Sequence, residues 1–174
     1  AHAAHDEHEH HDEHASLAAH EHGAAQLNVA LEGQRLELAL ESPAMNLVGF
    51  EHAAVSSSDK VAVARAQQHL QTPLALFGIA AAAGCVITSH ELHSPLFEAH
   101  AEEHEEHDKE HGAEHSDIDA NYVLTCSQPQ TLAAIDLSEL LKRFPATDKI
   151  QAQPNGPNGH KGAELPAAQQ RLNI

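Results

Sequence analysis

Residues Leu27 to Leu40 read LNVALEGQRLELAL, with an apolar residue at every second position on either side of Glu32-Gly33-Gln34. A period of two is typical of strands that bury one face, and a short Gly-containing stretch between two such runs favours a turn. The alternating positions are Leu27, Val29, Leu31, Leu36, Leu38 and Leu40. The stretch therefore predicts an antiparallel hairpin whose second strand ends at Ser42-Pro43.

Two helices are predicted downstream of the hairpin. Lys60 to Leu70 has apolar residues at helical spacing and must end before Pro73. A run of good N-cap residues precedes it, namely Ser56, Ser57, Ser58 and Asp59. A second, shorter helix is predicted to be capped by Ser138 and ended by Pro145.

Strand patterns occupy most of the remaining chain. Residues 85–92 form one, with Cys85 and Ile87 on one face, and Tyr122 to Cys126 forms another. Residues 149–153 and 160–165 flank an Asn-Gly-Pro-Asn-Gly turn and resemble a hairpin. A last short strand is expected from Arg171 to Ile174.

Hairpins dominate this order of elements, and no repeated strand–helix–strand crossover appears. We therefore expect an α+β fold, with a mostly antiparallel sheet and helices on one face. Residues 21–174 should form one domain that carries a His- and acid-rich insert at 98–119. Residues 1–20, a His- and acid-rich tail, contain too little apolar surface to bury, and we expect them to be disordered without metal.

The net charge of the chain disfavours some classes of binding partner. The formal net charge is -17 with His neutral, and nucleic acids and anionic membranes attract basic surfaces. We therefore expect no nucleic-acid partner. The longest apolar run, Leu74 to Ile87, covers 14 residues, whereas a membrane-spanning helix needs about 20, so no membrane span is expected.

The distribution of histidine is the strongest indication of function in the sequence. Of the 18 His, 13 lie in residues 1–22 and 98–119, together with 16 of the 26 acids. Neutral imidazole is the commonest metal ligand near pH 7. A merely solubilising segment needs acids but not His, and an engineered tag would carry uninterrupted His. Both segments therefore predict divalent-metal binding.

The two segments differ in spacing. Residues 5–14 read HDEHEHHDEH, where pairs such as His10 with His14 could clamp an ion on one helical turn. In the second segment five His are separated by 4, 3, 4 and 4 residues, which would align them along one stripe of a helix. Many like charges oppose that helix in the absence of metal, so we expect coil-to-helix coupling on binding. These five are His100, His104, His107, His111 and His115.

Further candidates lie where the segments join the body. His90 and His93 flank the entry to the insert, and three residues flank its exit, so all five could converge into one ordered site if the two strands pair; the three are His115, Asp117 and Asp119. The complete set of candidate metal ligands is His5, His8, His10, His11, His14, His20, His22, His52, His90, His93, His100, His104, His107, His111, His115, Asp117 and Asp119. Imidazole with carboxylate and without thiolate favours Zn²⁺, and Ni²⁺ or Cu²⁺ remains an alternative.

Two cysteines indicate the compartment. Cys85 and Cys126 lie in apolar strand patterns, and an even pair in a small chain suits an oxidising compartment. A disulfide between them would close a loop that contains the insert, whereas two buried free thiols are the alternative. The chain starts at Ala1 without an apolar targeting stretch, which we interpret as a signal peptide removed or a trimmed chain.

Several stretches together resemble the ZrgA-like family. They are His22-Gly23 before LNVALEG, the block ESPAMNLVGFEHA at 41–53, the Gly84-Cys85 strand, NYVLTC at 121–126 and Phe144-Pro145. The resemblance covers roughly residues 20–174, and the 41–53 block is its most specific part. It implies a zinc-regulated periplasmic protein of Gram-negative bacteria that binds zinc beside a zinc-uptake ABC transporter. It carries over no catalytic residues, so individual ligands rest on spacing alone.

The sequence thus predicts a periplasmic zinc buffer or carrier that supports zinc uptake. One alternative is the solute-binding component of a metal transporter, which we expect to have two lobes and a longer chain. Another is nickel or copper sequestration. We expect no enzyme, because a catalytic zinc needs fixed ligands and a general base in a shaped pocket.

Overall fold

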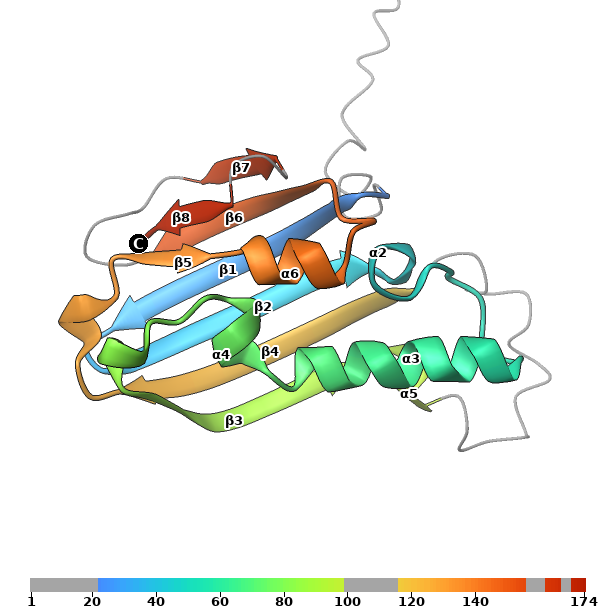
Figure 1. Ribbon diagram of the computed structural model, residues 1–174, viewed down its shortest axis with the longest axis horizontal. Helices are drawn as coiled ribbons and strands as arrows, with labels where there is room; N and C mark the ends of the chain where they lie inside the picture. The colour runs from blue at the N-terminus through green and yellow to red at the C-terminus, as the bar shows by residue number, and fades with distance from the viewer. Residues whose placement is uncertain (1–21, 99–115, 156–161, 167–169) are drawn as a thin grey trace, which may run out of the picture.

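The computed structural model describes residues 22–98, 116–155, 162–166 and 170–174 (Figure 1). Its strands are β1 (Ala24–Glu32), β2 (Arg35–Pro43), β3 (Cys85–His93), β4 (Asp117–Cys126), β5 (Ala134–Asp136), β6 (Lys149–Asn155), β7 (Ala163–Pro166) and β8 (Arg171–Asn173). Its helices are α2 (Ala44–Val48), α3 (Ser57–Leu70), α4 (Pro73–Leu76), α5 (Pro95–Glu98) and α6 (Ser138–Arg143), with 3-10 turns η2 (Ala81–Ala83) and η3 (Pro129–Thr131).

Six strands form one sheet in the order β3-β4-β2-β1-β6-β7, and β5 pairs with β8 in a second, small sheet. Every pair is antiparallel except β1 with β6, which is parallel. The predicted hairpin is confirmed, because Leu27 lies opposite Leu40 and Leu31 opposite Leu36. The predicted pairing around the Asn-Gly-Pro-Asn-Gly turn is also confirmed for β6 and β7, while the turn lies largely outside the described residues.

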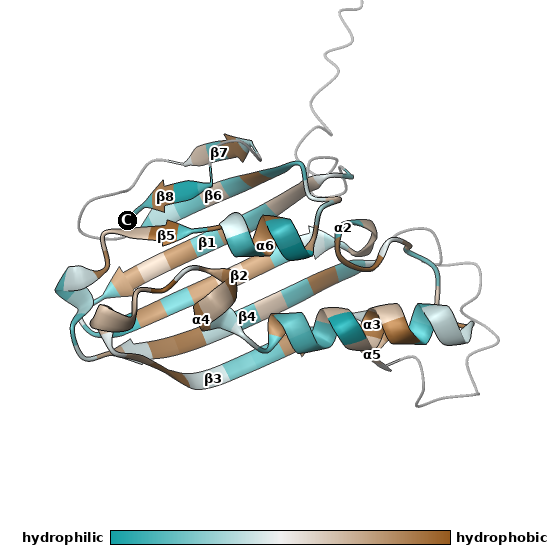
Figure 2. Cartoon of the chain, viewed as in Figure 1, coloured by the Kyte–Doolittle hydropathy of each residue, from teal (hydrophilic) through white to brown (hydrophobic). Residues whose placement is uncertain are grey.

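The helices and the small sheet lie on one face of the large sheet (Figure 1). Apolar and polar residues alternate along its strands (Figure 2), and the apolar ones of the hairpin are buried. Tyr122 on β4 links the layers: its hydroxyl donates a hydrogen bond to the carbonyl of Leu70, and its ring meets that of Phe77 edge-on at 5.6 Å. The prediction of an α+β fold with helices on one face is confirmed.

The helix starts differ from the sequence-based expectation. Ser56 caps α3, because its hydroxyl accepts a hydrogen bond from the Asp59 amide while Asp59 reaches back to the cap, so the helix begins before Lys60. Ser138 is the first residue of α6 and not its cap, which corrects the prediction. Asp136 accepts the Ser138 amide at 2.9 Å instead. Hydrogen bonding from the Ser138 side chain, and then from its amide, lowers the pKa of Asp136.

Strand β3 lies at the edge of the sheet. Ile87 shares a face with Cys85, as expected, because their partners on β4 are Leu124 and Cys126. Ile87 is nevertheless 39% exposed, and the register shifts between Ile87 and Ser89. Such an irregularity and the polar end of β3 are the devices by which proteins protect an exposed sheet edge from pairing with other chains.

A disulfide joins this edge strand to β4. Cys85 and Cys126 lie directly opposite each other and are bonded, with a sequence separation of 41. The predicted bond is therefore confirmed. It closes the loop that contains the second His-rich segment.

Candidate functional site

The candidate ligands of the body gather toward one end of the sheet. Because β1 and β2 are antiparallel, as are β2 with β4 and β4 with β3, the start of β1, the end of β2, the start of β4 and the end of β3 lie at the same end. Residues 22 and 116, which border the two His-rich segments, are at this end, and so is α5 (Figure 1). We call it the histidine end.

Hydrogen bonds tie the segment borders to one loop. The Ala44 amide donates to the Ser116 carbonyl at 2.8 Å, and the Ser116 hydroxyl donates to the Glu51 carbonyl at 2.9 Å. The Gly23 amide donates to the buried Asn46 side chain at 2.7 Å. The residues that follow each His-rich segment are thus fixed to the same stretch between β2 and α3.

Gly23 sets the direction in which the chain enters β1. Its φ is +87°, a conformation that favours glycine, and an added Cβ would collide with the Asp148 carboxylate. The Asp148 amide donates to the Gly23 carbonyl at 2.6 Å. This close approach fixes the position of His22.

His22 forms a pair with Glu51. The imidazole Nε2 lies 3.0 Å from the Glu51 Oε1, with the His22 side chain 51% exposed and that of Glu51 only 8% exposed. A buried carboxylate is costly unless it is paired, so the contact with His22 is part of what makes this burial possible. Glu51 was not predicted as a site residue, although it directly precedes the candidate His52.

His52 is held on the other side of the same loop. Its ring stacks on that of Phe50 at 4.7 Å, and its Nδ1 lies 2.8 Å from the Ala53 carbonyl and 3.9 Å from Asp59 Oδ2. A carbonyl only accepts, so this contact places the proton on Nδ1 and leaves the Nε2 lone pair for a ligand.

His93 and Asp119 face each other across β3 and β4. His93 Nε2 also lies 3.3 Å from Glu91 Oε2, and both side chains are well exposed. Burial, and then the neighbouring charge of Asp117, raise the pKa of Asp119, while His93 opposes that shift. A cation at this position would relieve the carboxylate repulsion.

The structure separates His90 from the other residues that were expected to converge beside the insert, and His115, one of them, lies outside the described residues. His90 lies opposite Tyr122 on the helix-facing side, whereas His93 lies opposite Asp119 on the other side. Side chains alternate between faces along a strand, so residues three apart point to opposite faces. Within residues 22–98, 116–155, 162–166 and 170–174, no three His, Cys, Asp or Glu side chains come close enough to hold a metal.

The other candidates lie outside the described residues, and their role as ligands stays a prediction. They are His5, His8, His10, His11, His14, His20, His100, His104, His107, His111 and His115. Asp117 and Asp119, which we placed in the insert, lie in β4.

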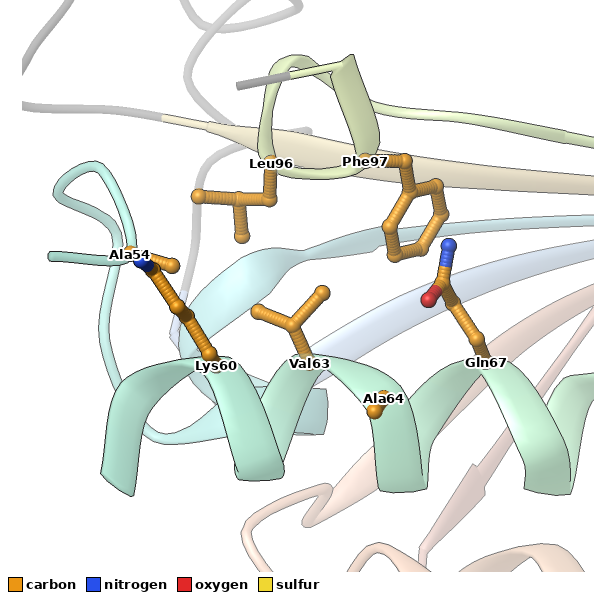
Figure 3. A pocket seen from close by; sticks show the side chains of 7 residues that line it. All are labelled: Ala54, Lys60, Val63, Ala64, Gln67, Leu96 and Phe97. Carbon is orange, nitrogen blue, oxygen red and sulfur yellow. The ribbon is translucent and has the colours of Figure 1, made fainter. Parts of the chain in front are cut away.

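Helix α5, just before the second His-rich segment, is anchored to α3. Leu96 and Phe97 point toward Val63 and Gln67 (Figure 3), beside a cleft of about 350 Å³. Apolar side chains dominate the lining of this cleft, and none of its described lining residues is a His or a carboxylate. The packing of α5 on α3 holds the residues that precede the second His-rich segment.

A family model described as ZrgA family zinc uptake protein matches residues 19–174. The chain belongs to the ZrgA family. The match includes His20, His22, His52 and the entire second His-rich segment, and it confirms the resemblance found in the sequence. No curated protein matches the chain.

Membership of the ZrgA family relates the chain to zinc uptake. The disulfide and the family are compatible with an extracellular or periplasmic location. Among the described helices, none is long and apolar enough to cross a membrane.

Proposed function

We propose that the protein is a periplasmic zinc-binding protein that buffers or carries zinc for uptake by an ABC transporter. One observation carries the proposal: in a chain of a zinc uptake family, the borders of both His-rich segments are fixed to one end of the folded body. Both His-rich segments therefore join the folded body at the same end.

The ligand chemistry supports a buffer or carrier. The described body offers His–carboxylate pairs, namely His22 with Glu51, His52 with Asp59, and His93 with Glu91. A structural zinc site has four protein ligands, so pairs alone bind weakly and exchange readily. Protonation of imidazole competes with the metal, so acidification should empty the sites.

We propose that the chain has no catalytic activity. A catalytic zinc needs three fixed protein ligands and an open position, and in the described part of the chain the candidate ligands meet only in pairs. Screening the zinc-loaded protein against ester, peptide and phosphoester substrates tests this. Hydrolysis that is lost on chelation would contradict it.

Calorimetric titration of zinc into the full chain tests the proposal directly. Imidazole-rich sites should take up several zinc ions and retain them in a millimolar excess of Mg²⁺ or Ca²⁺, which prefer oxygen ligands. Displacement of zinc by magnesium would contradict the zinc role. Displacement by an equimolar amount of nickel would instead favour the sequestration alternative.

A further inference from the structure

The carboxylate of Glu51 is nearly buried and lies 3.0 Å from the half-exposed imidazole of His22. We propose that Zn²⁺ binds between His22 Nε2 and Glu51 Oε1, which makes this pair a zinc site of the folded body at the base of the first His-rich segment. The inference rests on the proposed zinc function and identifies two of the residues that would bind the ion.

The geometry of the pair suits a zinc ion. The two atoms are 3.0 Å apart, whereas two ligands on a tetrahedral zinc are separated by roughly 3.4 Å, from Zn–N and Zn–O bonds of about 2.0 to 2.2 Å. His22 is half exposed, so its ring can move by the few tenths of an ångström that the ion needs. On binding, the imidazole proton passes through solvent to Nδ1, and the Nε2 lone pair faces the metal.

The surroundings hold Glu51 in place before metal arrives. Its backbone carbonyl accepts the Ser116 hydroxyl, while the Gly23–Asn46 hydrogen bond fixes the chain next to His22. The carboxylate itself is nearly buried, and an ionised group there attracts a divalent cation more strongly than one in water. The exposed side of His22 leaves the remaining coordination positions open to solvent, which suits an ion that must be loaded and passed on.

The other pairs lack these features. His93 and Glu91 are 3.3 Å apart, but their side chains are 60% and 69% exposed. His52 lies 3.9 Å from Asp59, whose carboxylate also belongs to the α3 capping box. The His93–Glu91 pair therefore has the same chemistry without the burial, and it provides a matched control.

The test compares four variants of the full chain, Glu51→Gln, His22→Ala, Glu91→Gln and His93→Ala. Zinc titration by calorimetry should show that the first two weaken one zinc-binding step on the order of tenfold or more, because even outer partners of metal ligands are worth 10–100-fold. The last two should change that step less than about threefold. Cadmium-113 NMR of the same proteins should lose one resonance in the first pair only.

Thermal melting of the metal-free variants separates a structural role from a ligand role. If Glu51→Gln lowers the melting temperature but leaves zinc affinity and the cadmium spectrum unchanged, the site is overturned. His22→Ala alters a half-exposed side chain, so it tests the site even if Glu51→Gln fails to fold. Equal losses in both pairs would also overturn it. If the unaltered chain binds no zinc at all, the proposed function itself fails.

Discussion

Removing the Cys85–Cys126 bond should cost about 4 kcal/mol of folding free energy. The bond joins residues 41 apart, and the chain-entropy relation for a loop of that size gives about 3.9 kcal/mol at 25 °C as an upper-side value. A small domain is stable by only about 5–15 kcal/mol, and a net charge of -17 opposes compaction. The loss is therefore a large fraction of the total.

Urea unfolding of the metal-free protein measures this loss. Three samples are needed: the oxidised protein, the same protein reduced with a phosphine, and the variant Cys85→Ala/Cys126→Ala. The oxidised protein should exceed the reduced one by about 4 kcal/mol. The reduced protein keeps both sulfurs, so any further loss in the variant reports the buried volume of the Cys126 side chain. Equal free energies of unfolding in oxidised and reduced protein would refute the reasoning.

Two further substitutions test the account of the sheet. Because burial and Asp117 raise the pKa of Asp119, the folded state binds that proton more tightly than the unfolded chain, and the associated stability is lost as pH rises through the raised value. Asp119→Asn should therefore raise the free energy of unfolding of the metal-free protein at pH 7 by less than about 1 kcal/mol. It should leave the free energy of unfolding at pH 2 unchanged. Urea unfolding that shows destabilisation at pH 7 would contradict this. Tyr122→Phe removes the hydrogen bond to the buried Leu70 carbonyl and should cost about 1–3 kcal/mol in urea unfolding, whereas an unchanged midpoint would show that the bond contributes nothing.

The hairpin was predictable because its periodicity is local. Apolar residues alternate in each arm of the stretch Leu27 to Leu40, on either side of the turn, and a slip of one residue would expose the leucines of that strand. The parallel pairing of β1 with β6 was not predictable, since it joins strands more than a hundred residues apart. The short β5 and α4 were missed because three or four residues carry no measurable period.

The candidate site was predictable in composition and only partly in geometry. Clustered histidines mark a metal-binding chain whatever its fold. The spacing of His90 and His93 already places them on opposite faces of a strand, so their convergence could have been rejected from sequence. Glu51 could not have been found in that way, because its burial and its contact with His22 depend on the loop between α2 and α3 folding against β1.

We propose that a folded body with its own zinc-binding pair carries two His-rich segments that join it at one end. Zinc calorimetry on a chain that lacks residues 1–19 and 99–112 tests it most directly, with circular dichroism to confirm the fold. The truncated chain should bind fewer zinc ions than the full protein and should retain one zinc site, at His22 and Glu51. A truncated chain that folds normally but binds no zinc would contradict the account.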